Sequence, residues 1–185
     1  VSESLEGAAR VKRLVLDLKS FSRVDEVEHK HADINECIES TLNIVWNELK
    51  YKAKVIKNLG ELPQTKCYPQ QLNQVFMNLL VNAAQAIPDG RRGTLRIRTG
   101  HDGEQVWIEI EDNGCGIAPE ALARIFDPFF TTKPVGKGTG LGLSLSYGII
   151  QKHHGKITAS STPGSGTLFR ITLPVHQPAE PGTPE

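Results

Sequence analysis

The chain has 185 residues, of which 38% are hydrophobic, and its 21 Lys and Arg are balanced by 21 Asp and Glu. This length fits one globular domain with an appendage better than two full domains, and the balanced charge gives no sign of a nucleic-acid partner. No apolar run approaches the roughly 20 residues that cross a bilayer, so we expect no membrane contact by this chain.

The N-terminus and the cysteines favour a cytoplasmic location. The first residues lack the layout of a signal peptide. Cys37, Cys67 and Cys115 are widely separated and include no CxxC pair, so neither a disulfide framework nor a zinc site is indicated. We expect a cytoplasmic chain with reduced, structural cysteines, and the full-length protein can still be tethered to a membrane elsewhere.

The first predicted element is an amphipathic helix from Leu5 to Phe21, because apolar residues recur there at spacings of three and four. The charged run that follows has little pattern and predicts a linker, so we place a helical segment at residues 1–24 and a linker at residues 25–32. The next predicted elements are a helix at Ile34–Leu49 and short strands at Ala53–Asn58 and Thr65–Tyr68.

The rest of the chain combines predicted helices with predicted hairpins. The elements are a long helix at Pro69–Ile87, strands at Leu95–Arg98 and Val106–Glu111, a helix at Leu141–His154, and strands at Lys156–Ser160 and Leu168–Leu173. His153 and His154 would lie favourably at the negative end of the helix that they terminate. The end of the chain, residues 175–185, is rich in Pro and Glu and is predicted to be a disordered tail.

These elements predict an α+β fold. Two antiparallel hairpins without repeated β-α-β alternation favour a two-layer α/β sandwich. In it, helices cover one face of a mixed, mostly antiparallel sheet, and the N-terminal helix precedes the sandwich. We place this domain at residues 33–174, and a Rossmann sheet is unsupported because the β-α-β repeat is missing.

The predicted helix at Pro69–Ile87 has a polar face that carries no charged residue. Solvated helix faces normally use Lys, Glu and Arg, which are better helix formers than Asn. Asn78 and Asn82 lie one turn apart on this face and project together. They are either partly buried amides bonded to neighbouring backbone, or oxygen ligands of Mg²⁺ with its waters and substrate phosphates. The whole stripe is Gln71, Gln74, Asn78, Asn82 and Gln85.

Asp112 ends a predicted strand and is followed by Gly114 and Gly116. An Asp before glycines is usually turn chemistry. The functional alternative is that the glycines let a ligand approach the backbone while the carboxylate accepts a hydrogen bond from an amino group. Adenine offers its exocyclic amine as that donor, whereas guanine presents a carbonyl oxygen that the carboxylate would repel. This alternative predicts selection of ATP over GTP.

A glycine-rich stretch from Gly138 to Gly142 leads into the last predicted helix. Free N–H groups and the dipole at a helix N-terminus bind anions, and glycines permit close contact with phosphates. The preceding run Ile125–Pro134 combines aromatic residues with Lys133 and is typical of a hinged lid. The sequence has no GxxxxGK[ST] and no G-x-G-x-x-G in a β-α-β unit, which excludes two other phosphate motifs. Each signal alone is also typical of an ordinary loop.

Five segments occur in order along the chain: NLLVNAAQA, DNGCGI, IFDPFFTTK, GKGTGLGLS and GSGT. They closely resemble the N, G1, F, G2 and G3 boxes of the histidine kinase ATP-binding domain, in the superfamily shared with gyrase, Hsp90 and MutL. The resemblance covers roughly residues 33–174. The segment before the linker also resembles the second helix of the dimerisation and phosphotransfer hairpin of such kinases.

The resemblance implies a Bergerat ATP-binding fold that holds ATP and Mg²⁺. It implies that Asn82, assisted by Asn78, binds the Mg²⁺ and that Asp112 binds adenine. Lys133 would face the terminal phosphate, and Asn78 and Lys133 would be the catalytic residues. Further nucleotide contacts would come from Gly114, Gly116, Ile117, Phe129, Thr131, Thr132, Gly138, Thr139, Gly140, Leu141, Gly142, Leu143 and Thr167.

The implied reaction is transfer of the γ-phosphoryl group of Mg-ATP to a histidine, and then to an aspartate in the receiver domain of a response regulator. The implied full-length protein is a homodimer. Where hydrolysing members of the superfamily carry a glutamate that activates water, this chain has Asn78, which cannot act as a general base. The alternatives are an ATPase of the same superfamily and a nucleotide-binding regulatory module without kinase activity.

Two departures limit what the resemblance implies. Many relatives place a Lys-Tyr pair after the second asparagine of the N box, whereas this chain has Gln85, Ala86 and Ile87 there. None of the 6 histidines has the His-Glu-x-x-Asn-Pro context of the phosphoacceptor. We therefore expect the phosphoacceptor to lie upstream of residue 1, and we expect this chain alone not to phosphorylate itself.

Overall fold

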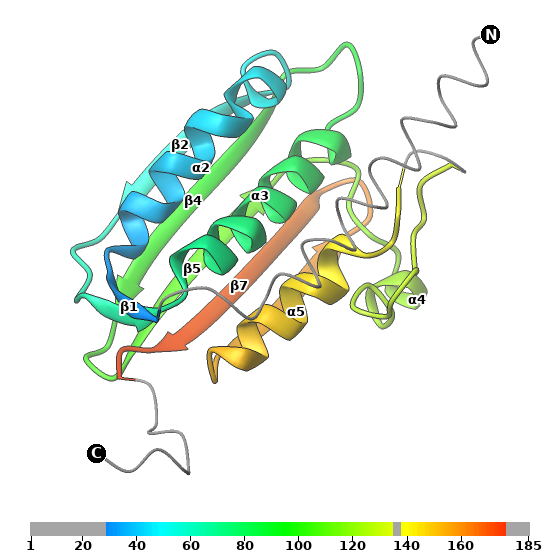
Figure 1. Cartoon of the computed structure of the whole chain (residues 1–185). Helices are drawn as coiled ribbons and strands as arrows, with labels where there is room; N and C mark the ends of the chain where they lie inside the picture. Colours follow the sequence, from blue (N-terminus) through cyan, green and yellow to red (C-terminus); the bar gives the residue numbers. More distant parts are fainter. Residues whose placement is uncertain (1–28, 135–137, 177–185) are drawn as a thin grey trace, which may run out of the picture.

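The main sheet is covered by helices on one face. The computed structural model describes residues 29–134 and 138–176, and within them a five-stranded sheet has the order β2-β4-β5-β7-β6. Figure 1 shows α2, α3 and α5 on the same face of this sheet. The predicted two-layer α/β sandwich is therefore confirmed. The predicted helix at Leu5–Phe21 lies outside the described residues, as does most of the predicted tail.

The sheet is mixed and mostly antiparallel, as predicted. Its strands are β2 (Ala53–Leu59), β4 (Gly93–His101), β5 (Gln105–Asp112), β7 (Gly166–Pro174) and β6 (Lys156–Thr162). The β2–β4 pair is parallel, and the other neighbouring pairs are antiparallel. A second, two-stranded antiparallel sheet consists of β1 (Lys30–Ala32) and β3 (Thr65–Cys67).

The two long helices of the core, α2 and α3, begin where the sequence supplies a start signal. The helices are α2 (Ile34–Leu49), α3 (Pro69–Ala86), the short α4 (Pro119–Leu122) and α5 (Gly142–Lys152). The Asp33 side chain accepts a hydrogen bond from the N–H of Asn35 at 2.7 Å and caps α2, which has its predicted bounds. Pro69 opens α3, where its missing N–H costs nothing. None of the helices in the described ranges is long and apolar enough to span a membrane.

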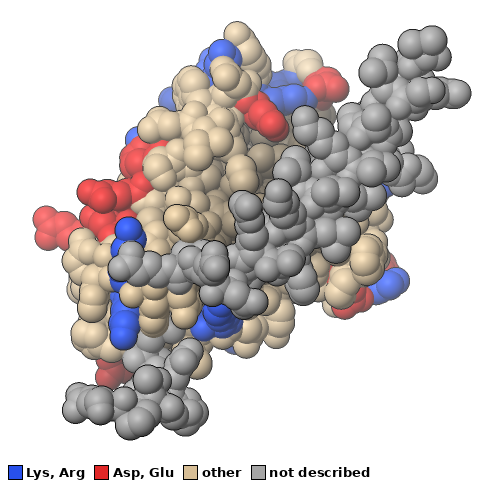
Figure 2. All heavy atoms as spheres, in the orientation of Figure 1, with Lys and Arg blue, Asp and Glu red and all other residues tan. Residues whose placement is uncertain are grey.

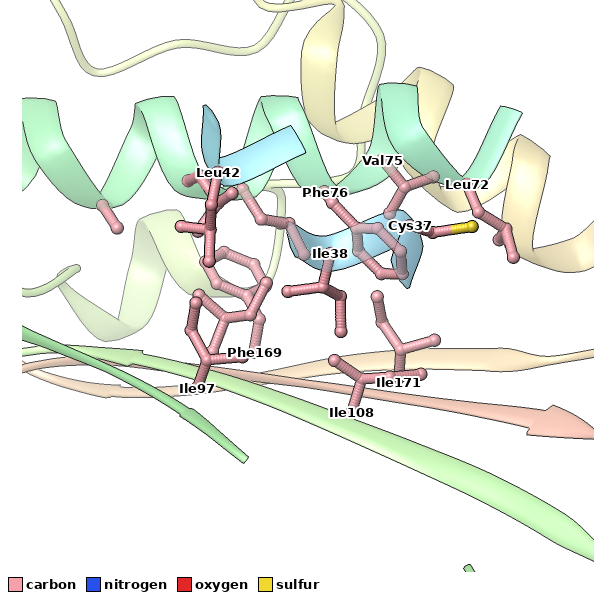
Figure 3. Close-up of a cluster of buried hydrophobic side chains, with 14 of the residues drawn as sticks. Cys37, Ile38, Leu42, Leu72, Val75, Phe76, Ile97, Ile108, Phe169 and Ile171 are labelled. Atoms are coloured by element: carbon pink, nitrogen blue, oxygen red, sulfur yellow. The ribbon is translucent and has the colours of Figure 1, made fainter. Parts of the chain in front are cut away.

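The core lies between α2, α3 and the inner face of the sheet. Phe76 of α3 is fully buried, and Figure 3 shows it among side chains of α2 above the strands. Burying one such side chain stabilises the fold by about 1.5–3 kcal/mol. Because this apolar stripe of α3 is fixed against the sheet, its polar stripe is held in one direction. The labelled core residues are Cys37, Ile38, Leu42, Leu72, Val75, Phe76, Ile97, Ile108, Phe169 and Ile171.

The structure differs from the predicted boundaries of the domain at both ends. Lys30–Ala32, placed in the linker by the sequence, form β1 and pair with β3. Val175, placed in the tail, is buried, and its N–H donates to the carbonyl oxygen of Glu104 at 2.9 Å. Both segments are too short to show a periodic pattern, and each obtains its hydrogen bonds from residues distant in the sequence.

His153 has a different role from the predicted one. The Tyr68 N–H donates to Nε2 of His153 at 3.0 Å, so Nδ1 carries the proton and donates to the carbonyl oxygen of Ile149 at 2.8 Å. The ring is buried and uncharged, and burial lowers the pKa of His153. His153 therefore fastens the end of α5 to the start of α3 as a neutral imidazole, rather than as a cation at a helix terminus.

This neutral histidine predicts a pH dependence of stability. Its pKa is lowered in the folded chain relative to about 6.5 in the unfolded chain, so the unfolded chain binds more protons. The contribution of His153 is fully present above about pH 6.5 and is lost as the pH falls below that value. We expect His153→Gln to be less stable near neutral pH by about 1–3 kcal/mol, since a glutamine whose oxygen accepts from the Tyr68 N–H cannot also replace the bond from Nδ1 to the Ile149 carbonyl.

Urea unfolding at a series of pH values measures both effects. Wild type should lose free energy of unfolding on acidification, and the difference between wild type and His153→Gln should shrink as the pH falls. His154→Asn, at the neighbouring exposed position, is the matched control and should keep the wild-type pH profile. A pH-independent difference between wild type and His153→Gln would contradict the assignment of a neutral ring.

Candidate functional site

The uncharged stripe of α3 faces the start of α5. In Figure 2, the part of the helical face that grey atoms do not cover is mostly uncharged, and Lys, Arg, Asp and Glu lie along its margins. Asn78 and Asn82 are half-buried, and Gln85 near the end of α3 is exposed. In Figure 1 the segment between α4 and α5 lies near this end of α3. The site is therefore formed by α3, the start of α5, and the segments that follow β5 and α4.

Asp112 is a buried carboxylate at the end of β5. Its Oδ1 accepts a hydrogen bond from the N–H of Gly114 at 2.8 Å, and it lies opposite Thr167 of β7 in the sheet register. Burial raises the pKa of Asp112, while hydrogen bonds from the backbone N–H groups of Gly114 and Thr167 act in the opposite direction. A carboxylate in this setting is stabilised by an additional hydrogen-bond donor, such as an amino group of a ligand.

The glycines after Asp112 allow backbone segments of the protein itself to approach one another. A Cβ on Gly114 would lie 2.5 Å from the carbonyl oxygen of Ala86, at the end of α3. Gly116 has φ +69°, and a Cβ there would lie 2.2 Å from the carbonyl oxygen of Thr162. Cys115 between them is exposed rather than part of the core, and its N–H donates to the Ala86 carbonyl at 2.8 Å. The segment is thereby held against α3.

Asn78 connects α3 to α5. Its Nδ2 donates to the carbonyl oxygen of Gly142 at 3.0 Å and lies 3.2 Å from Oγ of Ser146. Because the Gly142 carbonyl can only accept, Oδ1 of Asn78 must point the other way, where it accepts from Nε2 of Gln74 at 3.1 Å. The Asn78 amide is thus bonded to neighbouring groups of α3 and α5.

Lys133 contacts α3 instead of projecting into solvent. Its Nζ donates to Oδ1 of Asn82 at 2.9 Å and to Oε1 of Gln85 at 2.5 Å. Burial lowers the pKa of the Lys133 ammonium. The contact brings together two predicted site residues, Asn82 and Lys133, and adds Gln85, for which no separate role was predicted. The signal for Gln85 was its position in the uncharged stripe, one turn from Asn82.

The loop before α5 is held close to the segment after α4. Gly140 has φ +69°, and a Cβ there would lie 2.4 Å from the backbone of Phe129. A Cβ on Gly138 would lie 2.6 Å from Oγ1 of Thr131. α5 starts at Gly142 without a side-chain cap. Of the remaining predicted residues, Phe129, Thr131 and Thr132 are exposed, Thr167 is buried, and Ile117, Gly138, Thr139, Leu141, Gly142 and Leu143 are intermediate.

Ser146 and Ser161 are parts of the site that the sequence did not single out, whereas Gln74 was named as a member of the uncharged stripe. Ser146 is buried, and its hydroxyl donates to the Gly142 carbonyl at 2.8 Å. Ser161 Oγ accepts from the N–H of Ile117 at 2.8 Å and lies 2.9 Å from Oγ1 of Thr167. Serines within a helix or a strand carry no distinctive spacing, so no sequence signal could have identified them.

Comparisons with known proteins agree with this architecture. The family described as "Histidine kinase-, DNA gyrase B-, and HSP90-like ATPase" matches residues 67–177. Sporulation kinase E of Bacillus subtilis is 34% identical over 92% of this chain and 23% of its own length. The signal transduction histidine-protein kinase AtoS of Escherichia coli is 40% identical over 90% of this chain and 27% of its own length. The chain thus spans about a quarter of the length of these curated relatives.

Solved structures show the same fold. The mycobacterial sensor histidine kinase MprB superposes with a TM-score of 0.71 at 26% identity, over 81% of this chain and 99% of that chain. The catalytic domain of the histidine kinase ThkA superposes with a TM-score of 0.70 at 28% identity, over 80% of this chain and 98% of that chain. The chain therefore belongs to the histidine kinase-, DNA gyrase B- and HSP90-like ATPases, as the ATPase domain of a two-component sensor histidine kinase.

Proposed function

We propose that this chain binds Mg-ATP and transfers its γ-phosphoryl group to a histidine imidazole, from which an aspartate of a response regulator receives it. The observation that carries the proposal is the buried Asp112 carboxylate at the end of β5, and the uncapped start of α5 supports it. A carboxylate there can accept a hydrogen bond from the exocyclic amine of adenine. N–H groups at the start of α5 can donate hydrogen bonds to phosphate oxygens.

The cation that this family uses fits the residues present. Asn82 Oδ1 accepts a hydrogen bond from the Lys133 ammonium, and this contact of the oxygen with a cation supports the proposal. Neutral amide oxygens are hard ligands of the kind that Mg²⁺ binds beside phosphates and waters. When bound, Mg²⁺ would neutralise part of the charge on the phosphates. Asn82 would hold it, and Asn78 would act by fixing the Gly142 end of α5.

The groups around Asn78 favour phosphoryl transfer over hydrolysis. Activation of water needs a general base within hydrogen-bond reach. The groups bonded to Asn78 are the side chain of Gln74, the carbonyl of Gly142 and the hydroxyl of Ser146, and none is a carboxylate. We propose that positioning and charge neutralisation carry the catalysis, with Lys133 moving to the terminal phosphate.

The wider organisation of the protein is part of the proposal. Residues 1–24 would supply the second helix of the phosphotransfer hairpin, and the full-length protein would be a homodimer that works in the cytoplasm with a receiver domain. We propose that the ATP-binding domain extends beyond residues 33–174 at both ends. The pairing of β1 with β3 and the burial of Val175 support this extension. The histidine that receives the phosphoryl group would lie upstream of residue 1.

A labelling experiment tests the transfer. The chain is extended upstream to include the hairpin and is incubated with γ-³²P ATP and Mg²⁺. We expect an acid-labile, base-stable label on the extended protein, and no label on residues 1–185 alone, because none of the histidines in the latter has the sequence context of a phosphoacceptor. Chase with a receiver domain should move the label to an aspartate. Release of inorganic phosphate without label on protein would instead favour an ATPase.

A further inference from the structure

The position of Lys133 singles out two oxygens of α3. Its Nζ lies 2.9 Å from Asn82 Oδ1 and 2.5 Å from Gln85 Oε1, and Lys133 takes part in none of the ion pairs found in residues 29–134 and 138–176. An ammonium has three hydrogen-bond donors and no acceptor, so its partners are acceptor atoms such as oxygens. Within the described residues, the hydrogen-bond partners of this cation are therefore side-chain amide oxygens.

The two oxygens are well placed to act together. Asn82 and Gln85 are three residues apart on α3, and residues at this spacing lie on the same side of a helix. Asn82 is half-buried and Gln85 is exposed, so one oxygen is anchored in the site and the other can adjust. Because Gln85 is uncharged, this end of α3 carries no charge of its own, which leaves the pair able to bind a cation.

Asn78 is less suited to be the second oxygen. Its Oδ1 accepts from Gln74, and its Nδ2 is committed to the start of α5. Releasing the oxygen would require Gln74 to turn away, and rotating the amide would break the bond to the Gly142 carbonyl. The oxygen of Gln85 accepts its hydrogen bond from the Lys133 ammonium, so it becomes available when the ammonium leaves.

We infer that Asn82 and Gln85 form the cation-binding pair of this site, that the Lys133 ammonium occupies the pair in the nucleotide-free protein, and that Mg²⁺ arriving with nucleotide takes its place. The inference rests on the proposed function. It makes Gln85, rather than Asn78, the second protein oxygen directed toward Mg²⁺. A lysine held by neutral amides is released readily, because no opposite charge has to be left behind. The released ammonium is then free to contact phosphate.

The contribution of Mg²⁺ to nucleotide affinity tests the pair. Calorimetric titration of ADP in excess Mg²⁺ and in EDTA gives two dissociation constants, and their ratio measures the gain from the metal. Gln85→Ala should reduce this gain about tenfold, the lower end of what loss of a metal-supporting group costs, and should change the constant in EDTA little. Gln70→Ala, an exposed glutamine at the other end of α3, is the matched control and should keep the wild-type gain.

The displacement by metal is tested by removing the ammonium. Lys133→Met should lower the Mg²⁺ concentration that gives half-maximal ADP binding several-fold, because the competing cation is gone. Lys57→Met, which breaks a surface pair with Glu39, is the control and should leave that concentration unchanged. Protection of Lys133 from acetylation, read by mass spectrometry on nucleotide-free protein, should fall in Gln85→Ala.

The outcomes separate this inference from the proposed function. If wild type binds ADP more tightly with Mg²⁺, but Gln85→Ala keeps the full gain, the cation-binding pair is wrong and the nucleotide site stands. If Lys133→Met needs as much Mg²⁺ as wild type, or more, the ammonium does not compete for the pair. If wild type binds no adenine nucleotide under either condition, the proposed function itself fails.

Discussion

Asp112→Ala should weaken ATP binding about ten- to a hundredfold while leaving the fold intact. A hydrogen bond to a charged group contributes about 1.5–3 kcal/mol, which corresponds to this range of dissociation constants. The carboxylate is buried at the end of β5 and its pKa is raised by that burial, so the folded chain gains little from it in the absence of a ligand. Calorimetric titration with ATP and Mg²⁺ measures the loss, and circular dichroism checks the fold.

Two further variants sharpen this test. Asp112→Asn keeps the shape but offers an amide that can donate to the carbonyl oxygen of guanine, so the preference for ATP over GTP should shrink. Asp102→Ala removes an exposed carboxylate that bonds the turn before β5, and it should leave ATP affinity unchanged. Equal ATP affinity in wild type and Asp112→Ala would refute the role of Asp112 in adenine binding.

Gly166→Ala should destabilise the fold by about 2–4 kcal/mol, the range of a severe backbone conflict. Gly166 has φ +122°, and a Cβ there would lie 1.9 Å from the carbonyl oxygen of Asp112. The added carbon would therefore have to push β7 away from β5 at the residue that is proposed to read the base. We expect ATP affinity to fall together with stability, although the Asp112 side chain is unchanged.

The neighbouring glycine gives the control for Gly166. Gly164 also has a positive φ, +79°, but a Cβ there would meet nothing within 4 Å. Gly164→Ala should therefore show only the cost of the backbone conformation, about 1 kcal/mol, and should keep ATP affinity. Urea unfolding of the two variants compares them directly. Equal losses of stability would show that the close approach of Gly166 to β5 has no energetic weight.

Elements with a strong local pattern were predictable from the sequence. α2 has its predicted bounds, because its apolar spacing and the Asp33 cap are both local signals. β1 was missed, because a strand of three residues has no period to detect and is defined by its partner β3. The sequence likewise did not indicate that β2 pairs with β4 in parallel, because β3 and all of α3 lie between these two strands along the chain.

The site was predictable in its residue types and less so in its contacts. The uncharged stripe of α3 indicated that Asn78 and Asn82 face something polar, but the sequence could not tell that the amide of Asn78 is bonded to Gly142 and that of Asn82 to Lys133. The sequence indicated that a ligand approaches the backbone closely at Gly114 and Gly116. What approaches them is the backbone at Ala86 and Thr162, and only the three-dimensional fold determines that.

The two ends of the proposed site differ in how firmly their side chains are held in place, and this difference matters for inhibitor design. Asp112 is carried by a strand in the middle of the sheet and is held by backbone hydrogen bonds, whereas Lys133 comes from a loop and is held by side-chain amides. A small compound that mimics adenine would meet a preformed surface and would lose little free energy to ordering the protein. A phosphate mimic would first have to displace the lysine, so high affinity per atom should be sought at the base-binding end.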